Sequence, residues 1–157
     1  MKIDAYGTHL PLLARCVAAT DGAVLELGCG LYSTPILHAL CFDRDLVSVE
    51  SNKEWISRFK QYDCGTHSVI LGKPADHLNR KWSVALVDHA PAADRAKCVR
   101  ALANKADLIV CHDSEHRLYG YEPALKDFKY RVEWKRYAPW TTVVSNTMKL
   151  DFLKDLL

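Results

Sequence analysis

The chain has 157 residues, of which 49% are hydrophobic, and its net charge at pH 7 is +2. This length predicts one domain spanning residues 1–157, with enough interior for a single sheet and its helices. The small charge gives no reason to expect nucleic acid or an anionic membrane as a partner. No apolar run approaches the roughly 20 residues that a bilayer-spanning helix needs.

The N-terminus and the cysteines indicate a cytoplasmic protein. The first residues, MKIDAYGTHL, carry an acid and lack an apolar core, so they do not resemble a signal peptide. The six cysteines show neither C-x-x-C pairs nor zinc-ligand spacing. Several lie in apolar runs, which favours buried free thiols in a reducing compartment. They are Cys16, Cys29, Cys41, Cys64, Cys98 and Cys111.

The first expected element is a helix within residues 1–20. Thr8 is placed to cap its N-terminus, and the sequence Thr20-Asp21-Gly22 is placed to end it. Its apolar face would consist of Leu10, Leu13, Cys16 and Val17.

A strand, a glycine turn and a helix are predicted from the segment AVLELGCGLYST. The apolar run Val24–Leu27 is long enough for a buried strand but too short for a helix. Gly28 and Gly30 allow a sharp turn and the close approach of a ligand. Thr34 is the expected N-cap of the following helix, with Pro35 at its first position. Such a unit opens a nucleotide-binding α/β sheet.

Two acids strengthen this interpretation. Glu26 lies on the first strand, two residues before Gly28, where a buried carboxylate needs partners. A second apolar run, Leu46–Val49, ends at Glu50. A gap of about twenty residues from Gly28 to Glu50 is typical of an acid that accepts hydrogen bonds from nucleotide ribose hydroxyls. The alternative for Glu50 is a solvated strand end.

The stretch ELGCG, followed by Glu50, resembles the first two motifs of the class I S-adenosylmethionine (SAM) dependent methyltransferases. The resemblance implies SAM as cofactor, with Gly28 and Gly30 beside its methionine part, Glu26 on its ammonium group and Glu50 on its ribose. The leading helix would lie over the cofactor, contact the substrate, or merely cover a sheet edge. The cofactor-binding residues implied are Glu26, Gly28, Gly30, Tyr32, Ser33, Thr34, Glu50, Ser51, Asp76 and Asp88.

The loop after a third strand, Ser68–Leu71, contains Asp76. In the resembling family this loop contacts adenine, so Asp76 is expected near the exocyclic amine. The alternative is a helix cap for the following turn. Between the second and third strands, Ser51 to Glu54 fits a capping box for a helix whose buried stripe is Trp55, Ile56, Phe59 and Tyr62.

The remaining elements complete the expected fold. Further strands are predicted at Ser83–Val87, Leu108–Cys111, Arg131–Tyr137 and Thr141–Ser145, and further helices at Asp94–Asn104, within Tyr119–Tyr130 and at 149–157. Together the elements predict a three-layer α/β sandwich. Its sheet would be mostly parallel and Rossmann-like, with a C-terminal antiparallel hairpin.

Two strand ends carry the groups expected to move a proton. Asp88-His89 follows the fourth strand, and the sequence HDSEH follows the fifth. A hydroxyl nucleophile must lose its proton to a positioned base, or to a solvent-derived base after a metal has lowered its pKa. We expect metal-free methyl transfer to oxygen or nitrogen, with His89 or His116 as base and Asp88 or Asp113 orienting it.

A metal-dependent alternative rests on the stretch ALVDHAP. It resembles the strand end of catechol-type O-methyltransferases, in which the acid binds magnesium. Asp113-Ser114 lies where those enzymes carry a second metal-binding acid followed by asparagine. Ser114 leaves the oxygen-rich ligand set incomplete, so no metal is expected.

Two other functions stay open. A nicotinamide dinucleotide fingerprint needs a third glycine, where this chain has Ser33, and little length remains for a second domain. A SAM-binding module without catalysis is the other alternative, although every expected strand-end acid is present. Because the sheet uses most of the chain, we expect either a small-molecule acceptor or a pocket completed by a second copy in a homodimer.

Overall fold

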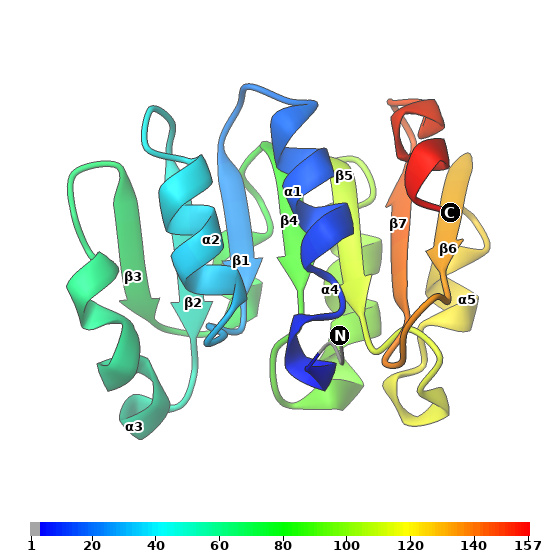
Figure 1. Cartoon of the computed structure of the whole chain (residues 1–157). Helices are drawn as coiled ribbons and strands as arrows, with labels where there is room; N and C mark the ends of the chain where they lie inside the picture. The colour runs from blue at the N-terminus through cyan, green and yellow to red at the C-terminus, as the bar shows by residue number, and fades with distance from the viewer. Residues whose placement is uncertain (1–3) are drawn as a thin grey trace.

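The computed structural model describes residues 4–157 and places seven strands in one sheet between two layers of helices (Figure 1). The strand order is β3-β2-β1-β4-β5-β7-β6. Strands β1 to β5 run parallel, and β7 runs antiparallel to its neighbours, confirming the predicted sandwich. The strands are β1 (Val24–Leu27), β2 (Leu46–Glu50), β3 (His67–Leu71), β4 (Trp82–Val87), β5 (Ala106–His112), β6 (Tyr130–Trp134) and β7 (Thr141–Ser145).

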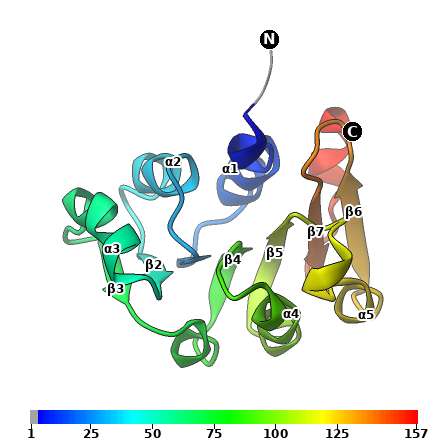
Figure 2. The ribbon, with the colours of Figure 1, turned by 90° about the horizontal axis from the view of Figure 1, so that it is seen from below.

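Helices cover both faces of the sheet (Figure 2). Helices α1 (Leu10–Ala18) and α2 (Ser33–Leu40) lie on one face, and α4 (Arg95–Leu102) and α5 (Glu122–Leu125) lie on the other. The shorter helices are η1 (Ala5–Gly7), α3 (Lys53–Ile56), η2 (Ser57–Tyr62), η3 (Pro74–His77), η4 (Ala92–Asp94), η5 (Arg117–Tyr119) and η6 (Asp151–Leu156). Within residues 4–157, no helix has the length and apolarity to cross a membrane.

Each face of the sheet packs against its own apolar core. Val84 and Leu86 of β4 point toward α1 and α2, whereas Ala85 and Val87 point toward α4 and α5. Because both faces are covered, β1 and β4 are buried along their whole length and mostly apolar, with Glu26 and Ser83 as buried polar exceptions. Each fully buried leucine or valine contributes about 1.5–3 kcal/mol relative to an exposed one.

The predicted first residues of helices α2 and α3 are wrong. α2 begins at Ser33, so Thr34 lies inside its first turn and does not cap it. The Thr34 hydroxyl instead donates to the Glu26 carboxylate and accepts the amide of Gly30, which precedes the helix. α3 is capped by Asn52 rather than by Ser51, because the Asn52 side chain accepts the amides of the next helical residues.

The two ends of the chain also differ from the sequence prediction. Thr8 is not a helix cap; α1 starts at Leu10, and the buried Thr8 hydroxyl bonds to residues of distant segments. The C-terminal helix forms, but as the 3-10 helix η6 over Asp151–Leu156. Its apolar residues still pack against the core that α1 and α2 cover, as the amphipathic pattern indicated.

The chain reverses its direction across the sheet between β1 and β4. From β1 it proceeds toward β2 and β3, and from β4 it proceeds toward β5, although β1 and β4 are neighbours. Such a switch in strand order opens a crevice at the carboxyl ends of the strands, where α/β sheets bind ligands. Gly28 follows β1 and Asp88 follows β4, so both lie at this point.

Candidate functional site

A cavity of about 680 Å³ lies at the carboxyl ends of β1, β4 and β5. The turn after β1 contributes Gly30 and Ser33, and the ends of β4 and β5 contribute Asp88, His112 and Asp113. The segment around η1, which lies below β4 and β5 in Figure 1, closes part of the wall. The other lining residues are Ala5, Tyr6, His9, Cys29, Leu31, Trp55, Arg95, Tyr119 and Pro139. The volume is typical of a small-molecule site.

The two glycines of the turn meet different needs. Gly28 has φ +93°, and a Cβ there would lie 2.7 Å from the carbonyl oxygen of Asp88. Glycine is therefore required by the neighbouring strand end, not only by a ligand. Gly30 lines the cavity, and its amide donates to the Thr34 hydroxyl at 3.0 Å. At Gly28 the turn therefore packs against the end of β4, whereas at Gly30 it faces the cavity.

Glu26 lies behind this turn, fully buried in β1. Its carboxylate accepts hydrogen bonds from Thr34 at 2.9 Å and from Ser48 of β2. Burial raises the pKa of Glu26 to about 7, although these hydroxyls act to lower it. In the described chain Glu26 is not on the cavity wall, and its predicted bond to a cofactor ammonium stays a prediction.

Glu50 ends β2 beside the same turn and is 9% exposed. One of its oxygens accepts the Asn52 amide at 2.8 Å. Trp55 of α3 reaches back over this edge, where its indole N–H donates to the Cys29 carbonyl at 2.7 Å. The predicted ribose acid and the glycine turn are therefore connected through α3.

Arg95 joins the two acids of the cavity. Its Nη1 lies 3.0 Å from Asp88 Oδ1 and 3.0 Å from Asp113 Oδ2, and its side chain is 9% exposed. Its Nε donates to the His89 carbonyl at 2.7 Å, and its guanidinium lies over the Tyr119 ring. The guanidinium occupies the space between the two carboxylates that the catechol-type resemblance assigns to magnesium.

His112 is buried and bonded through both ring nitrogens. Nδ1 lies 3.2 Å from Asp88 Oδ2, and Nε2 lies 3.0 Å from the Thr8 hydroxyl. Thr8 donates its proton to the Pro139 carbonyl at 2.7 Å, so His112 Nε2 must be the donor to Thr8. Burial alone would lower the pKa of His112, but the hydrogen bond and charge of Asp88 raise it above its ordinary value.

The pKa of Asp88 is lowered. Burial acts to raise it, but the hydrogen bond and charge of His112 and the charge of Arg95 outweigh that effect. Asp88 is therefore an anion at neutral pH, with one oxygen facing Arg95 and the other facing His112.

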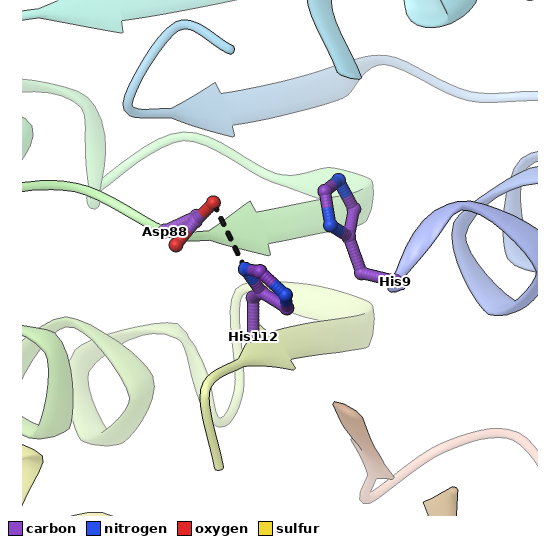
Figure 3. A group of neighbouring side chains, drawn as sticks. All are labelled: His9, Asp88 and His112. Carbon is purple, nitrogen blue, oxygen red and sulfur yellow. Dashed lines mark hydrogen bonds and ion pairs between the residues drawn. The ribbon is translucent and has the colours of Figure 1, made fainter. Parts of the chain in front are cut away.

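His9 completes this cluster from the segment before α1 (Figure 3). Its ring is 1% exposed and lies 4.5 Å, centroid to centroid, from the ring of His112. Burial and the charge of His112 lower the pKa of His9 to about 4, so it is neutral at pH 7. Within residues 4–157, neither ring nitrogen of His9 has a hydrogen-bond partner.

No protein-family model and no curated protein sequence matches the chain, but its structure is similar to solved methyltransferases. A Staphylococcus aureus protein assigned as a caffeoyl-CoA O-methyltransferase matches with a TM-score of 0.72 at 14% identity, over 92% of this chain and 85% of that one. The N-methyltransferase NodS from Bradyrhizobium japonicum WM9 matches with 0.60 at 13% identity, over 89% and 94%. A protein from Thermoplasma acidophilum assigned as a methyltransferase matches with 0.58 at 16% identity, over 82% and 70%.

This chain has the class I methyltransferase fold. The antiparallel pair of β6 and β7 completes the sheet, as the sequence resemblance implied. At identities of 13–16% the similarity concerns the fold, so the role of each residue rests on the geometry of this chain.

Two predicted bases lie apart from the acids of this class I methyltransferase fold. The Nε2 atom of His89 lies 3.7 Å from Cys98 Sγ. His89 lines a second cavity of about 490 Å³, and Asp88 is not among the residues that line it. His116 is exposed and stacks on the Tyr119 ring at 4.6 Å. Successive side chains of a strand point to opposite faces of the sheet, so the side chain of His89 points away from that of Asp88. The prediction that either histidine is oriented by Asp88 or Asp113 is therefore corrected.

The other predicted residues fall into four places. Gly30, Ser33, Asp88 and Asp113 line the first cavity, and Ser51 lines the second one with His89. Gly28 and Thr34 support the turn with Glu26. Tyr32 and Asp76 are exposed, although Pro74 and Ala75 next to Asp76 line the second cavity.

The sequence prediction missed His9 and Arg95 and did not select His112. His9 shares a helical face with Leu13 and Cys16, a spacing that predicts burial of its ring. Arg95 carries no such signal, because an arginine seven residues after an acid has no fixed direction and Asp113, its other partner, is brought to it only by the pairing of β4 with β5.

Proposed function

We propose that this chain transfers a methyl group from SAM to oxygen or nitrogen of a small-molecule acceptor. The observation that carries the proposal is the cavity at the switch between β1 and β4, with Gly30 and Ser33 on one side and Asp88 on the other. The fold supports it, and the similar protein NodS was also solved in complex with S-adenosyl-L-homocysteine.

The two cavities offer places for the two halves of the cofactor. The methionine part would lie beside Gly30 in the larger cavity, and the adenine in the smaller one, which Ser51, Pro74 and Leu78 line. Glu50 lies at the strand end immediately before Ser51, which suits a ribose between the two. A carboxylate there accepts hydrogen bonds from ribose hydroxyls.

Methyl transfer is an in-line displacement, so the site must hold the acceptor behind the methyl carbon. An acceptor hydroxyl must also lose its proton. We assign that step to the cluster of His9, Asp88 and His112, which combines a neutral imidazole with a fixed anion inside the cavity. This cluster replaces His89 and His116 in the mechanism.

The acceptor is proposed to be small. Aromatic side chains of Tyr6, Trp55 and Tyr119 line the cavity and offer flat apolar surfaces to a planar molecule. Tyr6 and Leu118 are exposed large side chains on this side of the chain, which would suit closure of the pocket by a second copy. Sedimentation equilibrium tests the expected homodimer.

Calorimetric titration with SAM, S-adenosyl-L-homocysteine and NADH tests the cofactor. We expect SAM to bind and NADH not to bind. Glu50→Ala should weaken SAM binding roughly tenfold or more, since a charged hydrogen-bond partner is worth about 1.5–3 kcal/mol. Glu54→Ala removes a nearby exposed acid and serves as the matched control. Unchanged affinity in Glu50→Ala removes Glu50 from the site, and preferential NADH binding contradicts the proposal.

Turnover distinguishes an enzyme from a binding module. Release of S-adenosyl-L-homocysteine is measured with a panel of small phenols, alcohols and amines. Product formation with any of them supports methyl transfer. Tight SAM binding without turnover on the whole panel favours the non-catalytic binding module.

A further inference from the structure

Three side chains from separate parts of the chain converge at one point of the larger cavity (Figure 3). His9 precedes α1, Asp88 follows β4, and His112 ends β5. One nitrogen or oxygen atom of each lies within 4.8 Å of the others. Two imidazoles and one carboxylate at such distances are a ligand set of transition-metal sites.

Two of the three ligand atoms are selected by neighbouring residues. His112 donates Nε2–H to Thr8, which turns Nδ1 toward Asp88. Asp88 pairs with Arg95 through Oδ1, which leaves Oδ2 on the side of His112. Partners of this kind orient the ligands in metal sites and fix the histidine tautomer.

His9 supplies an independent observation. Its imidazole is 1% exposed, and neither of its nitrogens has a hydrogen-bond partner among the described residues. A buried polar group without a partner is costly, so its presence needs an explanation. An ion held between His9, His112 and Asp88 supplies that partner.

We propose that His9, Asp88 and His112 bind a divalent transition-metal ion of the Zn²⁺ type. Nitrogen ligands favour such an ion over Mg²⁺, which takes oxygen ligands in a nearly octahedral set. The acids Asp88 and Asp113 do not form a magnesium pair, because Arg95 lies between them. The site therefore shares Asp88 with the magnesium site that the sequence resemblance suggested, but has His9 and His112 in place of Asp113.

The distances suit this ion. The 3.2 Å between His112 Nδ1 and Asp88 Oδ2 corresponds to an angle of about 100° at metal bonds of about 2.1 Å. The three ligand atoms lie within 4.8 Å of one another. Two ligands at about 2.1 Å from one ion lie at most about 4.2 Å apart, so His9 would have to approach the other two on binding. No hydrogen bond of the described chain opposes that approach. In the metal-free protein, a proton on His112 Nδ1 lies between this nitrogen and Asp88 Oδ2, where the ion would bind.

Metal binding is measured without cofactor or acceptor, so this inference goes beyond the proposed methyl transfer and stands apart from it. Within that function, His9, Asp88 and His112 would hold the ion instead of taking the proton themselves. The ion would act as a Lewis acid that lowers the pKa of the acceptor hydroxyl, and the proton would leave to solvent. The cavity that holds the three ligands also contains Gly30, where the cofactor is proposed to bind.

Titration of chelator-treated protein tests the site. Zn²⁺ and Co²⁺ should raise the melting temperature, Mg²⁺ should not, and bound Co²⁺ should show a visible absorption band of an ordered ligand set. His9→Leu should weaken Zn²⁺ binding by about 100-fold or more, since it removes a direct ligand whereas loss of an outer partner already costs about 10–100-fold.

His9→Leu is also a fair test of folding. It removes an imidazole without hydrogen bonds, so the metal-free variant should melt no lower than the wild type. His38→Leu is the matched control, because His38 pairs only with the unrelated His67 among the bonds of the described chain, at 3.1 Å. Zn²⁺ binding that survives His9→Leu, or that His38→Leu abolishes, overturns the proposal. Equal stabilisation by Mg²⁺ also overturns it.

Discussion

Two carboxylates on neighbouring strands of the sheet meet opposite surroundings. Glu26, in β1, is bonded to the neutral hydroxyls of Thr34 and Ser48, and burial raises its pKa to about 7. Asp88, at the end of β4, lies between Arg95 and His112, and its pKa is lowered. Burial favours the neutral form of an acid unless cations compensate for the lost water.

The difference in surroundings distinguishes a cluster that holds the glycine turn in place from a cluster that faces the cavity. The hydroxyl-bonded cluster of Glu26 lies behind the glycine turn and joins β1, β2 and α2. The cation-bonded cluster of Asp88 faces the cavity, where a fixed anion can position a ligand or a metal. A carboxylate in a strand-turn-helix motif is therefore not in itself a ligand-facing group.

The largest expected effect comes from removing the cation of the Asp88 cluster. Arg95→Met leaves Asp88 and Asp113 without their shared partner, which should lower the free energy of unfolding by about 3–5 kcal/mol. Urea unfolding at pH 7 measures it, with the exposed Arg100→Met as control. A loss equal to that of the control contradicts the view that cations set the state of Asp88.

The next effect concerns the proton on Glu26. Because its folded pKa, about 7, is above its ordinary 4.5, the folded state binds the proton more tightly. The resulting stability is fully present below pH 4.5 and is lost as pH rises through 7, a change of about 3 kcal/mol. Glu26→Gln should abolish this slope.

The measurement for Glu26 is the difference in unfolding free energy between wild type and Glu26→Gln from pH 4 to pH 9. Taking the difference removes the contributions of the other titrating groups. Glu54→Gln replaces an exposed acid and should leave the slope unchanged. A slope that persists in Glu26→Gln places the proton elsewhere.

The comparison also explains what the sequence could predict. The β1 strand, its turn and α2 follow from local features: an apolar run of strand length, two glycines and a following helix pattern. The mostly parallel sheet with its antiparallel pair follows because alternating strand and helix patterns leave few alternatives. Glu26 was correctly placed in the strand, and its need for partners followed from burial alone.

The Asp88 cluster could not be assembled in the same way. His9 lies far along the chain from Asp88 and meets it only after the sheet forms. Arg95 follows Asp88 by seven residues, but its second partner, Asp113, directly follows the end of the neighbouring strand. From the sequence HDSEH, the prediction selected Asp113 and His116 rather than His112. The backbone distinguishes these residues, since Asp113 has φ +55° and turns the chain away from the sheet directly after His112. That conformation is uncommon outside glycine, asparagine and aspartate.

A third prediction returns to the hydroxyls around Glu26. Thr34→Val removes the donor to Glu26 and the acceptor of the Gly30 amide with little change in shape. We expect a loss of about 1.5–3 kcal/mol, the range for a hydrogen bond to a charged or strongly polarised group. Urea unfolding measures it, and Thr34→Ser should retain most of the stability. A loss in Thr34→Val no larger than that in Thr34→Ser, which keeps the hydroxyl, would contradict the assignment to the hydrogen bonds.

The smallest effect tests how the cation of the Asp88 cluster is held. The guanidinium of Arg95 lies 4.5 Å from the centroid of the Tyr119 ring, and such a contact contributes about 0.5–1 kcal/mol at a partly exposed site. Tyr119→Leu should lose that amount, whereas Tyr119→Phe keeps the ring and should lose almost none. A double-mutant cycle with Arg95→Met isolates the contact, because the loss from Tyr119→Leu should vanish once the guanidinium is absent. Additive losses would mean that the two acids and the backbone carbonyl groups hold Arg95 without help from the ring.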